Sequence, residues 1–139
     1  MDDQFIAAEV ESLHRFIEQW FNGTVQKTTE SFSRLSNSWP EGFTLIDPNN
    51  KSHSSSVLLK STYDHFGKFP CLSIQVRNIR TSRHLPGVAV AVYEEWHVDT
   101  HETEARLCSA TFTFEAADPS RPQWVHIHES KLATGANAL

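Results

Sequence analysis

The hydrophobic pattern of the chain changes its period at Pro70, and this change limits the fold more than any other sequence feature. Before Pro70, apolar residues recur every three or four positions, the spacing of an amphipathic helix. After it, they alternate with polar residues, the spacing of a half-buried strand. Helices followed by a run of strands predict an α+β fold, with a meandering antiparallel sheet and helices on one face.

The helical part is expected to hold three helices and one short hairpin. A weak helix is expected over residues 25–36, and a third begins at the serines 54–56 and ends at Gly67. Between them, residues 43–46 and 51–53 are expected to pair across the turn 47–50. An apolar stripe predicts the first helix over residues 3–21, and its members are Ile6, Val10, Leu13, Ile17 and Trp20.

Four long strands are expected to follow, separated by reversals of the chain. The first begins after Pro70, and the others span residues 87–98, 107–115 and 123–130. The segment 87–98 is apolar on both faces, so it is expected to be central and covered on both sides. The dipeptides Asp118-Pro119 and Arg121-Pro122 are expected to mark the turn before the last strand.

Length and charge bound the class of protein. A chain of 139 residues is expected to form a single domain over residues 1–139. Its net charge is −5, from 17 acidic and 12 basic residues, so neither nucleic acid nor a membrane is an expected partner. The N-terminus is acidic rather than basic, and Cys71 and Cys108 form no CxxC pair. A cytoplasmic location with reduced thiols is therefore expected.

Three segments of the sequence resemble a known superfamily. They are the ending Trp124–Ser130, the strand 91–95, and the first helix with its Asn22-Gly23 stop. In these segments the chain resembles the nuclear transport factor 2-like superfamily, and especially the association domain of calcium/calmodulin-dependent kinase II and SnoaL-like small pocket proteins. The resemblance implies a cystatin-like fold, in which a cone-shaped, strongly bent antiparallel sheet wraps around the N-terminal helix. It does not imply one activity, because this fold hosts isomerases, dehydratases, cyclases and oligomerisation modules.

The chain departs from the kinase association domains in its pocket. Those domains line the pocket with arginines that can hold a carboxylate. The resemblance places Glu95, Glu129 and Phe112 at the corresponding positions of this chain. A pocket changed in this way is expected to favour a neutral or cationic ligand.

Two residues of the central strand are candidate catalytic groups. Glu95 and His97 alternate with their neighbours and so share one face, which the resemblance turns toward the pocket. A carboxylate beside an imidazole in an apolar pocket is a plausible acid–base pair. The alternative is that Glu95 forms an ion pair with Arg77. The expected ligand-contacting residues are Phe16, Trp20, Tyr63, Tyr93, Phe112 and Glu129.

No metal or other cofactor is expected. His126 and His128 share a strand face with Trp124 and could chelate a divalent ion, but no third ligand is evident. The resemblance turns these side chains to the outer sheet face, where subunits pack. The acidic and histidine-rich run from His97 to Glu104 is expected to be a solvated hairpin tip.

Two classes of function remain open. The first is a pocket protein that binds a small apolar molecule and, if an enzyme, transforms it by isomerase-, dehydratase- or cyclase-like acid–base chemistry. The second is an association module without activity, assembled as a homodimer or a multiple of it. An open cavity with Glu95 inside it favours the first class, and a closed cone packed by Trp20, Phe66 and Phe112 favours the second. The outer surface expected to be covered in the dimer comprises Val88, Val90, Val92, Trp96, Trp124 and His126.

Overall fold

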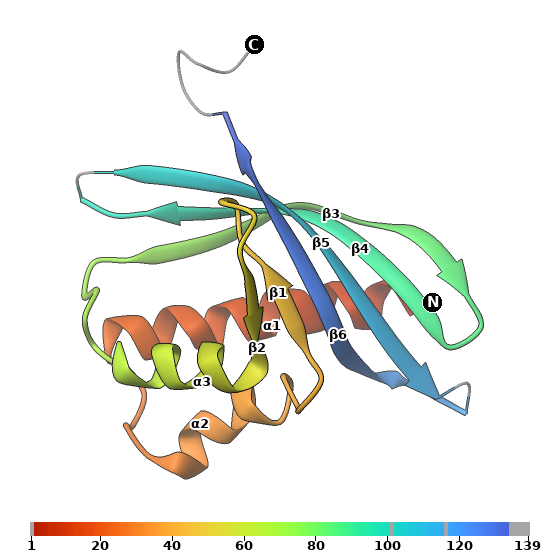
Figure 1. Ribbon diagram of the computed structural model, residues 1–139, viewed down its shortest axis with the longest axis horizontal. Coiled ribbons are helices and arrows are strands. Elements are labelled where there is room, and N and C mark those ends of the chain that lie inside the picture. The colour runs from red at the N-terminus through yellow and green to blue at the C-terminus, as the bar shows by residue number, and fades with distance from the viewer. Residues whose placement is uncertain (1, 101, 116, 134–139) are drawn as a thin grey trace.

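The computed structural model describes residues 2–100, 102–115 and 117–133, and it confirms the α+β fold. Within these residues the chain forms three helices and six strands, and Figure 1 shows how they are arranged. The helices are α1 (Asp2–Asn22), α2 (Thr29–Ser36) and α3 (Ser55–Asp64). The strands are β1 (Thr44–Ile46), β2 (Ser52–Ser54), β3 (Ser73–Leu85), β4 (Val88–Val98), β5 (Thr103–Glu115) and β6 (Asp118–Leu132).

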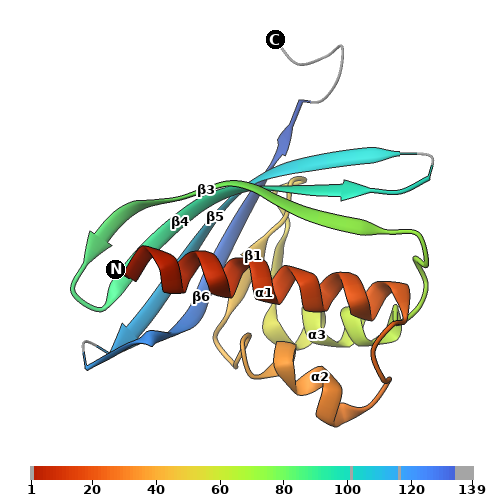
Figure 2. The ribbon, with the colours of Figure 1, turned by 180° about the vertical axis from the view of Figure 1, so that it is seen from behind.

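The strands form one bent sheet in the order β2-β1-β6-β5-β4-β3. β3 to β6 follow one another as an antiparallel meander, as predicted. β1 pairs with β6 in parallel, so the sheet is mixed. Seen from both sides, α1 lies across the concave face of the sheet, and α2 and α3 close one end (Figures 1 and 2).

The apolar stripe of α1 is the centre of the core. Ile6, Val10, Leu13 and Trp20 are buried, whereas Ile17 is only half-buried. The opposing sheet face offers small residues, and the inward positions of β4 include Ala89 and Ala91, both fully buried. Burying a large apolar side chain such as Ile6 or Leu13 stabilises the fold by about 1.5–3 kcal/mol. The stripe therefore contributes much of the free energy that holds α1 on the sheet.

An aromatic cluster joins the three helices around Trp20. The rings of Phe32, Tyr63 and Phe66 lie 4.7, 5.1 and 4.7 Å from that of Trp20. Its Nε1 donates to the backbone oxygen of Thr62 at 2.8 Å, so the one polar atom of the indole is satisfied inside the cluster. The cluster fixes the ends of α1 and α3 together.

Helix ends follow their capping residues. Thr28 accepts a hydrogen bond from the backbone of Ser31, which explains why α2 begins at Thr29, later than predicted. Ser54 caps α3 in the same way. Gly23 follows α1 with φ of 77°, and an added Cβ there would lie 3.3 Å from Cα of Gly67. The glycine is needed both for its backbone conformation and for this close approach.

A β-bulge overturns one prediction about β6. Thr111 pairs with His126, but the next residue, Phe112, pairs with Trp124, so Val125 is an extra residue. The extra residue reverses the alternation before it and turns Trp124 into the core, at 2% exposure. The prediction that Trp124 lies on the outer face beside His126 is therefore wrong.

The start of β6 also differs from its prediction. The strand begins at Asp118, which pairs with Glu115, so both prolines lie within the strand rather than in a turn before it. The pairing with β5 is irregular over this stretch, so not every residue has to donate a backbone N–H to the neighbouring strand, and proline is tolerated. Among the described residues, no helix combines the length and apolarity needed to span a membrane.

Candidate functional site

A cavity of about 1020 Å³ lies between α1, the β1–β2 hairpin and the concave side of the sheet. Its walls come from distant parts of the chain and combine apolar with polar side chains. The apolar ones include Ile17, Phe21, Trp39, Leu45, Leu58, Ile127 and Leu132. A polar group of five side chains comes from α1, β4, β5 and β6: His14, Glu95, His97, Arg106 and Glu129. A cavity with an apolar wall and convergent polar groups is the usual form of a small-molecule site.

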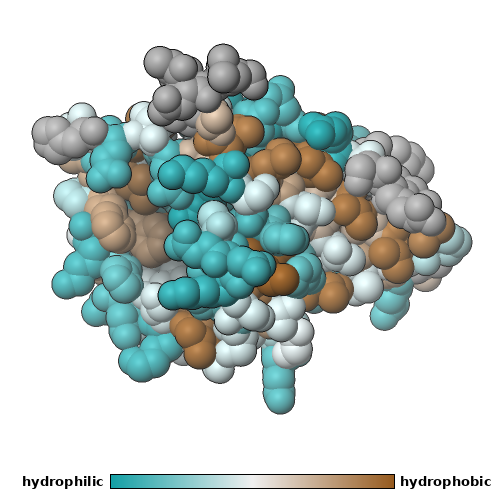
Figure 3. Space-filling model, turned by 45° about the horizontal axis from the view of Figure 1, so that its top comes forward, coloured by the Kyte–Doolittle hydropathy of each residue, from teal (hydrophilic) through white to brown (hydrophobic). Residues whose placement is uncertain are grey.

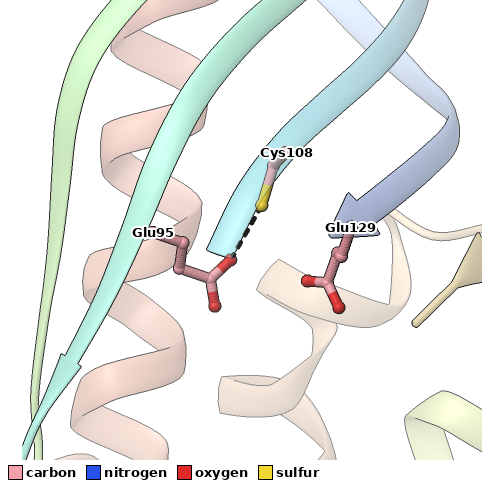
Figure 4. A group of neighbouring side chains, drawn as sticks. All are labelled: Glu95, Cys108 and Glu129. Carbon is pink, nitrogen blue, oxygen red and sulfur yellow. Dashed lines mark hydrogen bonds between the residues drawn. The ribbon is translucent and has the colours of Figure 1, made fainter. Parts of the chain in front are cut away.

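Glu95 of β4 is the centre of the polar group. Its side chain is held between two imidazoles, with Oε2 at 3.0 Å from Nε2 of His14 and Oε1 at 2.5 Å from Nε2 of His97. The thiol of Cys108 donates to the same Oε2 at 3.8 Å (Figure 4). With only 7% of the residue exposed, these contacts replace water around the carboxylate.

His14 reaches Glu95 from the buried face of α1. Its Nδ1 lies 2.8 Å from the backbone oxygen of Val10, an acceptor, and its Nε2 faces the carboxylate, another acceptor. An imidazole whose two nitrogens both donate is an imidazolium. Burial lowers the pKa of His14, but the charge and hydrogen bond of Glu95 outweigh it, so the pKa is raised.

The pKa of Glu95 moves in the matching direction. Burial raises it, yet the charges and hydrogen bonds of His14 and His97 together bring it well below its ordinary value. Glu95 is therefore a buried carboxylate at neutral pH. The alternative of an ion pair with Arg77 is wrong, since that guanidinium lies 4.2 Å from the ring centre of Trp96.

Glu129 of β6 is a second buried acid, beside Glu95 and Cys108 (Figure 4). Arg106 donates from Nη1 to its Oε1 at 2.9 Å and from Nε to Glu104 at 2.7 Å. Burial and the negative charge of Glu95 raise the pKa of Glu129 to about 7, against the opposing effect of Arg106. Near neutral pH this carboxyl therefore exists in both protonation states.

Comparison with known proteins supports the fold. No family model matches the sequence, and no curated protein is recognisably similar to it. Among solved structures, a protein of unknown function from Pseudomonas aeruginosa, described as NTF-2 like, superposes with a TM-score of 0.84 at 19% identity. That match covers 93% of this chain and 99% of the other. The fold is nuclear transport factor 2-like.

Two other solved structures with this fold are described as proteins of different kinds. The CaMKII hub of S. rosetta superposes with a TM-score of 0.67 at 11% identity, covering 92% of this chain and 95% of that one. A protein described as a candidate ketosteroid isomerase from Parabacteroides distasonis has a TM-score of 0.53 at 12% identity, covering 84% and 83%. The predicted superfamily resemblance is thus confirmed at the level of fold. At such identities the likeness establishes no activity.

The cavity of this nuclear transport factor 2-like fold contains three of the eight predicted site residues. Glu95, His97 and Glu129 lie on its wall. The other five do not line it and pack in or against the hydrophobic core: Phe16, Trp20, Tyr63, Tyr93 and Phe112. Contact between these five and a ligand stays a prediction, one that the cavity wall does not support.

Three residues that surround Glu95 and Glu129 were not singled out from the sequence as site residues. His14 lies four residues after Val10 and three before Ile17, so the helical period could have placed it on the buried face of α1. Arg106 and Cys108 alternate on the inward side of β5, opposite Glu95 and Tyr93. The period of each element contained the signal, but which residues meet across elements depends on the register of the sheet.

The residues expected to form a solvated hairpin tip lie at the mouth of the cavity. Glu102 and Glu104 are exposed and also line the cavity, together with the half-buried pair of Asp47 and His53, whose Oδ2 and Nε2 are 2.8 Å apart. His101 lies outside the described residues. The mouth is therefore predominantly acidic, with Lys131 as the cation beside it.

The described residues do not form a convincing metal site. Glu95, Cys108 and Glu129 bring one ligand atom each to within 4.8 Å of one another. Burial and the neighbouring carboxylates raise the pKa of the Cys108 thiol, and Oε1 of Glu129 already accepts a hydrogen bond from Arg106. His126 is hydrogen-bonded to Thr44 at 2.8 Å and His128 is exposed, and no third ligand joins them among the described residues. We assign no metal to either place.

Proposed function

We propose that this chain is a pocket protein that binds a small, largely apolar, neutral or cationic molecule and can transform it by acid–base chemistry. The observation that carries this proposal is the cluster of Glu95, His14 and His97 on the wall of a cavity of about 1020 Å³, beside the apolar side chains that also line it. Buried charges are unfavourable unless something uses or balances them, and charged groups with shifted pKa values gather at functional sites.

The geometry suggests a division of roles between Glu95 and His97. Glu95 is ionised, so Nε2 of His97 carries the hydrogen of their shared bond. That arrangement leaves Nδ1 of His97 to exchange a proton with a ligand, while Glu95 orients the ring. His97 also lines the cavity, with a side-chain exposure of 24%. In an isomerase-, dehydratase- or cyclase-like reaction, His97 would move the proton and Glu95 would position it.

The charge of the cavity supports a neutral or cationic ligand over a carboxylate. Asp47, Glu95, Glu102, Glu104 and Glu129 line it, against the cations Arg106 and Lys131 and three histidines. Arg106 is bound to both Glu104 and Glu129, so it is not available to hold a ligand carboxylate.

A library of small apolar compounds, matched as amines, neutral alcohols or ketones, and carboxylates, tests the proposal. We expect neutral or cationic members to bind, and His97→Gln to abolish turnover or to slow it by about 100-fold or more if the ligand is transformed. The exposed His128 provides the matched control, since His128→Gln should behave as wild type. Preferential binding of carboxylates, or equal activity of the His97 variant, would contradict the proposal.

A second candidate function, an association module, is favoured by the outer face of the sheet. Val88, Val90, Val92 and Trp96 point away from α1 on β4 and are only half-buried in the single chain. A homodimer through this face would cover them. Trp20, Phe66 and Phe112 do pack inside the sheet as a closed core would require, yet the cavity lies beside them, so the two functions do not exclude each other.

A further inference from the structure

Glu129 differs from Glu95 in having one carboxylate oxygen uncommitted. Its Oε1 accepts from Arg106, and no hydrogen bond from the described residues reaches its Oε2. The residue is 6% exposed and lines the cavity, so the solvent around this oxygen is limited to what the cavity holds. Oε2 is not among the buried polar atoms without a partner, so it is accessible from the cavity, where a ligand could supply its donor.

The charges around Glu129 define which donor fits. From α1 comes the imidazolium of His14, from β4 the carboxylate of Glu95, and from β5 the guanidinium of Arg106 with its second partner Glu104. The fully buried Tyr93 hydroxyl has no hydrogen-bond partner among the described residues. It and the Cys108 thiol stay neutral, because burial and the nearby charges raise the pKa of each.

The two cations and two anions of this set cancel. Ionising Glu129 therefore leaves one negative charge that these neighbours do not balance. At the cavity mouth, the cation Lys131 of β6 and the acid Glu102 both line the cavity, and Asp47 is paired with His53. A ligand with a single positive charge and a hydrogen to donate restores neutrality at the Oε2 of Glu129.

Resting on the function proposed above, we propose that the ligand is a small organic amine with an apolar body, and that its ammonium group binds Oε2 of Glu129. Binding then expels the proton that part of the Glu129 population carries in the ligand-free protein. The apolar body of the amine would lie against the wall formed by Ile17, Phe21 and Leu58.

Proton release is the measurement that separates this proposal from simple apolar binding. Alkyl amines remain protonated between pH 6 and 8, so the proton must come from the protein. With a Glu129 pKa of about 7, we expect release of about 0.9 proton per ligand at pH 6, about half at pH 7 and about 0.1 at pH 8. The affinity should rise about tenfold from pH 6 to pH 8.

The experiment is isothermal titration calorimetry in pairs of buffers with equal pH and different ionisation enthalpies. The probes are benzylamine, 2-phenylethylamine and tryptamine, each with its neutral alcohol, and 3-phenylpropionate as the carboxylate. Glu129→Gln keeps the size of the side chain and an acceptor for Arg106, but it should abolish proton release and weaken amine binding by about 10- to 100-fold. Glu11→Gln removes an equal charge from the exposed side of α1 and should behave as wild type.

Three results would overturn the amine proposal. They are alcohols that bind as tightly as their amines, proton release that persists in Glu129→Gln, and no binding of any of the three amines at millimolar concentration. Tight binding of the alcohols alone would leave the pocket function standing and remove only its amine anchor. Preferential binding of 3-phenylpropionate would overturn both.

Discussion

The pair of His14 and Glu95 joins two residues that are 81 positions apart, and the sequence does not display this contact. The chemistry of each residue was visible separately: Glu95 as a carboxylate inside a strand, and His14 inside the buried face of a helix. The pairing depends on where α1 crosses the sheet, and no local pattern encodes that position. For this reason Glu95 and His97 could be predicted as site residues from the sequence, whereas His14, which lowers the pKa of Glu95, was missed.

A double-mutant cycle tests the ion pair. Glu95→Gln leaves a buried imidazolium with one partner fewer, and His14→Gln leaves the carboxylate held by His97 and Cys108 alone. We expect each single variant to lose about 3 kcal/mol of stability and the double variant to lose clearly less than their sum. Chemical denaturation of the four proteins gives the coupling. Additive losses would show that the two residues do not form a buried pair.

Because of this expected loss, Glu95→Gln tests binding only when stability is measured beside it. If the pocket is used, the variant should fail to bind or transform its ligand below its own melting temperature, where the fold is intact. A variant that binds normally while melting earlier would assign Glu95 a structural role only.

The pKa shifts also predict how stability depends on pH. The pKa of His14 is raised in the fold, so its contribution is complete below pH 6.5 and is lost as the pH rises through the folded value. The pKa of Glu129 is raised from 4.5 to about 7, so the stability falls over that window as well. Glu95 has a lowered pKa, and its contribution is present above pH 4.5 and lost as the pH falls through the folded value.

We therefore expect the ligand-free protein to be most stable near pH 4.5 and to lose stability as the pH rises to about 7. Glu129→Gln should be about as stable as wild type at pH 4.5 and more stable at pH 8, since glutamine resembles the protonated acid. Melting temperatures across this range measure the effect. Parallel curves for the two proteins would contradict the raised pKa of Glu129.

At the scale of elements, hydrophobic period identified every helix and long strand but not every partner or face. The stripe of α1 and the alternation of β4 and β5 are long enough to determine which side is buried. β1 has three residues, too few for a pattern to show whether it pairs in parallel or antiparallel. In β6 the extra residue Val125 interrupts the alternation. Because side chains alternate with a period of two, the residues before Val125 point to the opposite face from the one that simple alternation predicts.

Truncation of Trp124 tests the bulge. Trp124 packs 4.5 Å from the ring of Phe112 and donates from Nε1 to Glu9 at 2.8 Å. Trp124→Ala should therefore lose about 3–5 kcal/mol of stability, while Val125→Ala, at a side chain exposed on the other face, should lose about 0.5 kcal/mol. Similar small losses for both would return Trp124 to the outer face.

At the scale of the whole molecule, the two faces of the sheet differ in what covers them. The concave face packs against α1 and forms part of the cavity wall, and most of its side chains are apolar because they are buried. In the view of Figure 3, apolar side chains are interrupted by hydrophilic ones. On the outer face of the sheet the guanidinium of Arg77 lies over the ring of Trp96, so that face is less apolar than its valines alone suggest.

The outer valines of β4 are nevertheless the feature that a lone chain explains least. Val92 lies opposite Ser109 of β5, in the middle of the sheet, and is half-buried with no helix above it. In a two-fold dimer the same strand of a second copy would cover it, and a charge placed there would be buried without a partner. We expect sedimentation at micromolar concentration to report a dimer or a multiple of it for wild type, and Val92→Glu to shift the protein to monomer. Val57→Glu, at a valine that is 56% exposed on α3, should leave the assembly unchanged. A wild-type monomer would refute the dimer, whereas a dimer that persists in Val92→Glu would place its interface on another surface.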